Sequence, residues 1–294
     1  MEAGLEALAA VPGGAAAVGA LLGLMVGSFL NVVAHRLPRM LERRWRADCR
    51  ELLGLEPPAR EPPREEETGR YDLVSPSSHC PRCGHRLRAW ENLPVLSYLL
   101  LRGRCRACGR PISLRYPLVE LLTAALSAAV CWRFGLTWPA AAALLLTWGL
   151  LALALIDLEH QILPDDLTYP LLWAGLLASL PGWFVPPETA IVGAAAGYLS
   201  LWSIYVLHRW ATGREGMGHG DFKLLAVLGA WLGWQGLPAV ILASSVLGAL
   251  AGLLLMLTGR LRRGHPLPFG PFLAGAGWAV LLVGPDLAGL LPFG

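Results

Sequence analysis

Long apolar segments recur along most of the 294-residue chain, separated by short polar stretches. A membrane-spanning helix needs about 20 predominantly apolar residues, and most of these segments approach or exceed that length. Gly and Ala are frequent within them, and small residues let membrane helices pack closely. The pattern therefore predicts an all-α polytopic membrane protein with about eight transmembrane helices. The predicted spans are Val11–Ala34, Pro117–Phe134, Trp138–Ile156, Leu167–Phe184, Thr189–Leu207, Phe222–Leu237, Ala239–Thr258 and Phe269–Leu290.

Charge is scarce overall and is concentrated in one segment. Charged residues make up 15% of the chain, whereas soluble domains average about 25%. Residues 36–115 hold 17 of the 24 Lys and Arg residues together with 10 acidic residues, a net charge of +7. Because basic loops stay on the cytoplasmic side of a membrane, this insert is predicted to be cytoplasmic, with the N-terminus outside. We expect residues 1–35 to form the first transmembrane helix, 36–115 the cytoplasmic insert and 116–294 a seven-helix transmembrane core.

The insert contains a basic segment, a spacer and a cysteine-bearing region. Arg39–Leu53 has the pattern of a short basic amphipathic helix, which we expect to lie on the membrane surface. Glu56–Gly69 is rich in proline and charge, which is typical of a flexible spacer. His79–Arg115 carries two CxxC pairs separated by 21 residues.

Two CxxC pairs at this separation are typical of a four-thiolate zinc site. A metal ion would join two turns that contain too few apolar residues to form a core. Disulfides are the alternative interpretation, but thiols in the cytoplasm are kept reduced. We therefore predict a small zinc-ribbon-like insert with one structural Zn²⁺, and its ligands are Cys80, Cys83, Cys105 and Cys108.

Two aspartates fall at the predicted cytoplasmic face of the transmembrane core. Asp157 follows 19 uncharged residues, and Asp221 ends a glycine-rich segment. A carboxylate at the edge of the hydrocarbon is costly and often functional. Two close carboxylates can share a proton, so that one activates water and the other protonates a scissile amide. The pattern indicates a catalytic aspartyl dyad, with Gly218 and Gly220 allowing an extended peptide to approach.

Other interpretations of these carboxylates stay open. Asp221 can be a simple N-cap of the helix that follows it, and Asp157 can belong to a hydrophilic turn. A proton-coupled transporter would use both groups as proton relays, although it does not explain the paired cysteines. A membrane-anchored zinc-binding adaptor would use neither aspartate in catalysis. The chain contains neither the GxSxG motif of serine hydrolases nor the HExxH motif of zinc proteases.

Further polar residues lie near the same predicted face. Glu120 is about one turn inside the second span, where it either supports the dyad, binds the positive end of a substrate, or makes a structural hydrogen bond. Lys223 lies at the cytoplasmic boundary, and we group it with Glu120 as a substrate-binding or supporting residue. Ser28 and Asn31, in the first span, are predicted to form interhelical hydrogen bonds.

Several short motifs, taken together and in order, resemble the bacterial type IV prepilin peptidases, which are GxGD-type intramembrane aspartyl proteases. A bare GxGD motif would be weak, but the complete set is specific and covers nearly the whole chain. The Glu56–Gly69 spacer is the least similar part. The motifs are Gly27–Val33 with Arg36–Pro38, Cys80–Cys83, Glu91–Pro94, Ser97–Leu99, Leu101–Cys108, Ile112–Pro117 with Val119–Leu122, Ile156–Asp165 and Gly218–Asp221.

The resemblance implies a bifunctional enzyme of the bacterial inner membrane. Members of this family cleave the basic leader of type IV prepilins and pseudopilins at the cytoplasmic face, and then N-methylate the new terminal residue with S-adenosylmethionine. By position, Asp157 and Asp221 match the catalytic pair, and the four cysteines match the zinc-type cysteines. Gly103 lies in the segment associated with methyl transfer. The implied partners are these protein substrates and the lipid bilayer, with no nucleic acid.

Overall fold

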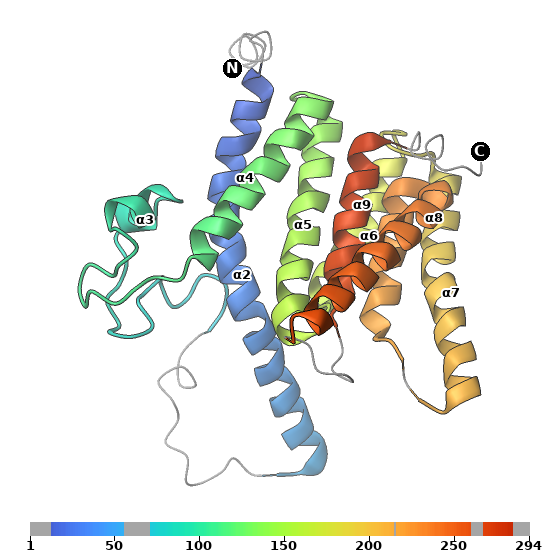
Figure 1. The fold of residues 1–294 in the computed structure, drawn as a ribbon, viewed down its shortest axis with the longest axis horizontal. Helices are drawn as coiled ribbons and strands as arrows, with labels where there is room; N and C mark the ends of the chain where they lie inside the picture. The colour runs from blue at the N-terminus through green and yellow to red at the C-terminus, as the bar shows by residue number, and fades with distance from the viewer. Residues whose placement is uncertain (1–12, 56–70, 215, 260–266, 285–294) are drawn as a thin grey trace. The chain divides into compact units, whose positions relative to one another are not determined.

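The computed structural model describes residues 13–55, 71–214, 216–259 and 267–284, which are mostly helical (Figure 1). Within them, extended structure is limited to two isolated bridges, His79 with Arg86 and Arg104 with Pro111. The predicted all-α class is confirmed. In chain order the elements are α2 (Gly14–Leu53), η1 (Ala89–Asn92), α3 (Leu96–Leu100), α4 (Arg115–Phe134), α5 (Trp138–His160), α6 (Asp165–Ser179), α7 (Pro187–Thr212), α8 (His219–Leu257) and α9 (Gly270–Val283).

The described residues fall into two compact units. One unit comprises residues 20–126, and it contains most of α2, the insert and the first part of α4. The other contains the described residues before 20 and after 126, and it holds the rest of α4 together with α5 to α9. The division expected from the sequence, at residues 35 and 115, stays a prediction.

Five of the described helices are long and apolar enough to cross a bilayer, namely α2, α4, α5, α7 and α8. The helices α6 and α9 coincide with two further predicted spans, but they are only 15 and 14 residues long. The predicted end of the last span, at Leu290, lies outside the described residues. The two remaining predicted spans fall within α8, except that the second was predicted to end one residue later, at Thr258. Every predicted span thus corresponds to a helix or to part of one.

The helix α8 is interrupted at Gly233, whose φ of 71° and ψ of 172° are not helical. The sequence placed this boundary four residues later, next to Pro238, and that position is wrong. Only glycine adopts such a conformation at low cost, and a Cβ atom at this position would lie 2.6 Å from Cγ2 of Thr189. The glycine, rather than the proline, therefore separates the two halves of α8.

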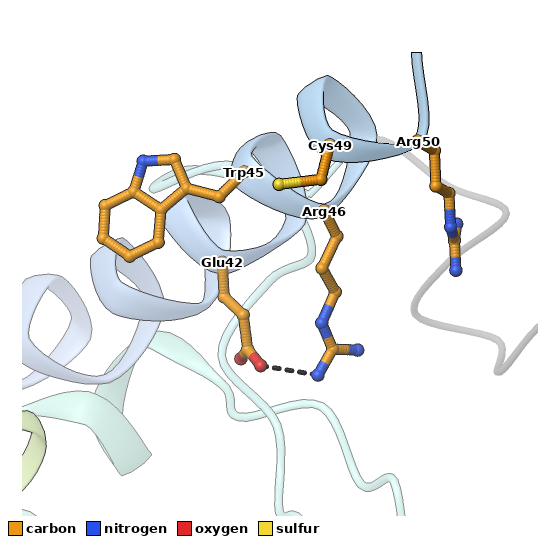
Figure 2. Close-up of a pocket in the computed structure, with 5 residues that line it drawn as sticks. All are labelled: Glu42, Trp45, Arg46, Cys49 and Arg50. Carbon is orange, nitrogen blue, oxygen red and sulfur yellow. Dashed lines mark hydrogen bonds and ion pairs between the residues drawn. The ribbon is translucent and has the colours of Figure 1, made fainter. Parts of the chain in front are cut away.

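The helix α2 continues well beyond the predicted first span as a single 40-residue helix. Arg39–Leu53 is therefore helical, as predicted, but it is not a separate helix on the membrane surface. An open surface depression lies on this part of α2 (Figure 2). All of its lining comes from one helix, so it is not an enclosed cavity, and it contains none of the candidate site residues. The lining residues are Glu42, Trp45, Arg46, Cys49 and Arg50.

The first half of α8 forms the centre of the second unit. Phe222, Leu225 and Leu228 are fully buried, and a helix that is apolar all round is expected inside a bundle rather than on its surface. The indole N–H of Trp231 donates to the carbonyl of Leu171 in α6 at 2.9 Å. This burial explains why so short a predicted span is stable, and it fixes the position of the residues at the start of α8.

Candidate active site and cysteine cluster

Asp157 lies in the last turn of α5, and its side chain is buried, with the residue 6% exposed. The helix ends at His160, and the next residue, Gln161, has a φ of 55° that turns the chain toward α6. One oxygen of Asp157, Oδ2, accepts a hydrogen bond of 3.0 Å from the backbone N–H of Gly270. Gly270 is the first residue of α9, and the N-terminus of a helix favours a negative charge. The sequence did not predict this contact.

Asp221 lies in the first turn of α8 and is 9% exposed. The N-cap of this helix is Gly218, so the interpretation of Asp221 as a simple N-cap is wrong. His219 packs its ring against Tyr205 and Phe222, with ring centroids 5.1 and 5.3 Å apart. These aromatic contacts hold the start of α8 against α7.

The two aspartates lie within the same compact unit and close enough for their charges to interact. The half-buried side chain of Leu163 connects the helix ends around them. A Cβ atom on Gly220 would lie 2.8 Å from Cβ of Leu163, and one on Gly270 would lie 3.2 Å from Cδ2 of Leu163. The end of α5, the start of α8 and the start of α9 thus meet around one pair of buried carboxylates.

Lys223 forms an ion pair within this region. Its ammonium group donates to both carboxylate oxygens of Asp165, at 2.7 and 2.8 Å, and it lies over the ring of Tyr169. The contact connects the first turn of α8 to the first turn of α6. Gly218 has more space, because a Cβ atom there would have only Asp221 Oδ2 nearby, at 4.0 Å. The predicted roles of Lys223 and Gly218 toward a substrate stay predictions.

Glu120 belongs to the other compact unit, and its contacts there are structural. Its buried carboxylate accepts the backbone N–H of Val95 at 2.7 Å and interacts with the hydroxyl of Ser28. Asn31 donates to the carbonyl of Tyr116 in α4 at 3.2 Å. The predicted hydrogen bond between the first two spans is therefore confirmed for Asn31, and Ser28 interacts with Glu120 across the same two spans. A role for Glu120 beside the aspartates stays a prediction.

The four predicted metal ligands form one cluster. Their sulfur atoms all lie within 4.8 Å of one another, with Cys80 and Cys108 4.0 Å apart and Cys83 and Cys105 also 4.0 Å apart. A disulfide requires sulfurs about 2.05 Å apart, so these cysteines are free thiols. Four Zn–S bonds of about 2.3 Å in a tetrahedron place the sulfurs about 3.8 Å apart. The cluster is therefore close to the geometry that a tetrahedral ion needs.

Each cysteine pair is shaped by the same backbone turn. The N–H of Cys80 donates to the carbonyl of His85, and the N–H of Cys105 donates to that of Arg110. A glycine with a φ of about 70° follows each pair, at Gly84 and Gly109. This repetition is visible in the sequence as two CxxCG motifs, and it gives two equivalent turns whose sulfurs face each other.

Backbone N–H groups also favour ionised sulfur in each turn. Burial opposes ionisation of the Cys80 thiol, but hydrogen bonds from the backbone of Arg82 and Cys83 lower its pKa to about 7. The backbone N–H groups of Cys108 and Ala107 lower the pKa of Cys105. Because the thiolate is the form that binds metal, one cysteine of each pair is prepared to act as a ligand.

A buried carboxylate that the sequence did not single out connects the two turns. Glu91 accepts the backbone N–H of Arg88 at 2.8 Å and lies 3.2 Å from Nε2 of His85. Its second oxygen lies 4.0 Å from the guanidinium of Arg106, in the other CxxC pair. The backbone hydrogen bond, together with His85 and Arg106, lowers the pKa of Glu91. The sequence identifies Glu91 only as the first residue of the Glu91–Pro94 motif, with no role of its own.

Gly103 forms a buried turn between α3 and the second cysteine pair. Its φ is 66°, and a Cβ atom would lie 2.7 Å from the hydroxyl of Tyr98. Its N–H donates to the carbonyl of Tyr98 at 2.8 Å. Any larger residue would therefore displace Tyr98, so this turn requires glycine for both space and conformation.

Two protein-family models match the chain. The bacterial peptidase A24 N-terminal domain matches residues 21–134, and the type IV leader peptidase family matches residues 144–253. A prepilin leader peptidase/N-methyltransferase of Pseudomonas aeruginosa is 57% identical over 267 residues, which cover 91% of this chain and 90% of the relative. A protein of the same name from Burkholderia pseudomallei is 52% identical over 283 residues, covering 95% of this chain and 89% of the relative. No solved structure gives a significant match to the chain.

Proposed function

Because this chain belongs to the type IV leader peptidase family, we propose that it cleaves the leader peptide of type IV prepilins and then N-methylates the amine that cleavage exposes. The observation that carries the peptidase assignment is the pair of buried carboxylates, Asp157 and Asp221, where α5, α8 and α9 meet. A proton-coupled transporter is not supported by the family matches. Pseudopilins, which share the prepilin type of leader, are proposed as further substrates.

The two aspartates are proposed to have different roles in hydrolysis. The N–H of Gly270 stabilises a negative charge on Asp157, which suits the general base. Asp157 then takes a proton from water as the water oxygen bonds to the carbonyl carbon, and Asp221 donates its proton to the carbonyl oxygen. When the C–N bond breaks, the departing amine takes up the proton held by Asp157, and the carbonyl re-forms as a carboxyl group while Asp221 regains its proton.

The cysteine cluster is proposed to hold one structural zinc ion. The four sulfurs fit this ion in number, type and approximate separation. A bound ion would connect the two turns, which Glu91 also connects through its contacts with His85 and Arg106. S-adenosylmethionine is proposed as the methyl donor, which supplies an activated methyl group for transfer to the neutral amine. The segment around Gly103 is proposed to take part in this second reaction.

The protein is a multi-pass membrane protein, and we propose that it lies in the bacterial inner membrane with the insert in the cytoplasm. The concentration of basic residues in 36–115 supports this orientation. The end of α5 and the starts of α8 and α9 then face the cytoplasm, where the basic leader of a prepilin would be found. The N-terminus would lie on the opposite side.

The peptidase assignment is tested with purified protein in nanodiscs and a full-length prepilin. We expect Asp157→Asn and Asp221→Asn each to abolish leader cleavage while leaving the helix content and melting temperature close to those of the wild type. Glu188→Gln is the matched control, because Glu188 is an exposed carboxylate at the start of α7, and it should retain activity. Substantial cleavage by either Asn variant would disprove the dyad.

Methylation is tested separately with a prepilin that has already lost its leader. Both Asn variants should still methylate this substrate when S-adenosylmethionine is supplied, because the cysteine-bearing insert and Gly103 are unchanged. Mass spectrometry of the pilin N-terminus distinguishes the two reactions. Failure of both reactions in a folded Asn variant would argue against two separable activities.

A further inference from the structure

The short helix α3 exposes a group of leucines that no described element covers. Leu96, Leu99 and Leu100 are 58%, 64% and 70% exposed, and α3 contains no buried residue. Leu93, just before the helix, is also exposed. So many apolar side chains within eight residues are unusual on a surface that faces only water.

The start of α3 is fixed at a definite depth along α4. Val95 donates its N–H to the buried carboxylate of Glu120 at 2.7 Å, and both residues belong to the same compact unit. Glu120 lies five residues after Arg115, the first residue of α4, which corresponds to about 7 Å along the helix axis. The beginning of α3 therefore lies beside the second turn of a membrane-spanning helix, rather than beyond its end.

The backbone around α3 is held in one conformation. Val95 has a φ of 59°, which β-branched residues strongly avoid, and the carboxylate of Glu120 stabilises this arrangement. At the other end of the helix, Tyr98 packs onto Gly103, and the N–H of Gly103 bonds back to Tyr98. The backbone is thus fixed both before and after α3, and this holds the exposed leucines in place.

Basic side chains follow the leucines immediately. Arg102 and Arg104 are both exposed, and they lie directly after α3 in the turn that leads to the second cysteine pair. Helices that lie in the membrane interface combine an apolar face, buried about 5–10 Å below the headgroups, with Lys or Arg at the polar edge. The depth set by Glu120 and the order of residues along α3 both match this description.

We propose that α3 is a lipid-facing anchor, with Leu96, Leu99 and Leu100 inserted into the cytoplasmic boundary between headgroups and acyl chains. Arg102 and Arg104 contact lipid phosphates. The anchor holds the adjoining turn at Gly103 against the membrane surface. The cysteine-bearing insert is thereby attached to the bilayer through its own side chains as well as through α2 and α4.

The test uses the full-length protein in phospholipid vesicles, with a benzophenone amino acid at single positions. After irradiation, mass spectrometry measures the yield of lipid adducts at each position. We expect position 99 to yield several times more lipid adduct than position 52. Position 118, an exposed leucine on α4 within the span, is the positive control and should also react with lipid.

Leu52 is the matched negative control for this experiment. It is a leucine on α2 that is even more exposed than Leu99, at 85% against 64%. It lies 21 residues beyond Asn31, which is level with the start of α4 because it bonds to Tyr116. This separation corresponds to about 31 Å along α2, well outside the hydrocarbon. Positions 99 and 52 are thus both leucines in the native chain, and they differ in their expected depth in the bilayer.

Two outcomes would overturn the proposal. Position 99 could give no more lipid adduct than position 52 while position 118 reacts, which would place α3 in water. It could instead react mainly with a second copy of the chain, or with an added prepilin, which would make the leucines a protein-docking surface. The expected result would be strengthened if Glu120→Ala, which releases the N–H of Val95, lowered the lipid yield at 99 and not at 118. None of these readouts depends on cleavage.

Discussion

The aspartate region and the cysteine-bearing insert are stabilised in different ways. Asp157 and Asp221 lie on helices whose neighbouring residues are fully buried, with Phe222 and Ile156 showing no exposed surface. In the insert, nearly every residue between Cys80 and Cys108 is at least partly exposed, and the exceptions are Glu91, Gly103 and Cys105. Packing positions the carboxylates, whereas turns, sulfurs and a buried carboxylate position the insert.

This difference matters because the two kinds of stabilisation respond to different perturbations. A packed helix bundle tolerates the loss of one polar contact but not a change of volume. A segment with little core depends on a few specific connections, as small metal-binding domains do. The contrast therefore predicts which substitutions unfold a region and which only disturb its chemistry.

The largest effect is expected from removing the cysteines proposed as metal ligands. Cys80→Ser with Cys105→Ser should abolish zinc binding and unfold the insert, since structural zinc contributes on the order of 10 kcal/mol to such small sites. Hydrogen–deuterium exchange in nanodiscs should show faster exchange at residues 78–88 and 103–112, and unchanged exchange in α8. Cys49→Ser, an exposed cysteine outside the cluster, is the control. If the backbone amides of the insert stay protected from exchange in the double variant, the insert does not depend on metal, and the two regions are not stabilised differently.

A smaller loss, in activity rather than fold, is expected at the start of α9. Gly270→Ala would place a Cβ atom 2.7 Å from Oδ2 of Asp157, so the carboxylate must move. A displacement of about 1 Å at a reacting group can reduce the rate about 100-fold. We expect kcat for cleavage to fall by about this factor with methylation of a leaderless pilin unchanged. Gly275→Ala on the same helix meets no atom within 4 Å, and it should behave as wild type.

An intermediate effect that depends on pH is expected at Glu91. Its pKa in the folded protein is lowered from 4.5, chiefly by the N–H of Arg88, so the ionised carboxylate stabilises the fold at pH values above about 4.5. This contribution is lost as the pH falls through the lowered value. Glu91→Gln should therefore speed amide exchange in the insert at pH 7, and the difference from wild type should shrink near pH 4. Glu51→Gln, on the exposed end of α2, is the control, and a difference that is constant with pH would exclude this account.

Local patterns in the sequence were sufficient to predict the helices, the cysteine cluster and the positions of both aspartates at helix ends. The cysteine cluster could be predicted because each CxxCG motif is complete within five residues. The contact between Asp157 and Gly270 could not, because 113 residues separate them and α9 begins with no charged or capping side chain. The break in α8 was misplaced because the apolar run continues to Leu237, whereas the tight packing of Gly233 against Thr189 decides the position of the break.

The smallest effect is expected for Lys223, and it distinguishes a structural role from a substrate-binding one. Its ion pair with Asp165 is partly exposed to solvent, and such pairs contribute about 0–1 kcal/mol. Lys223→Met should lower the melting temperature slightly and leave both kcat and KM for prepilin cleavage unchanged. Asp165→Asn, which breaks the same ion pair from the other side, should give the same small shift. If Lys223→Met raises KM several-fold while Asp165→Asn does not, the ammonium contacts the substrate, and the ion pair is not its main role.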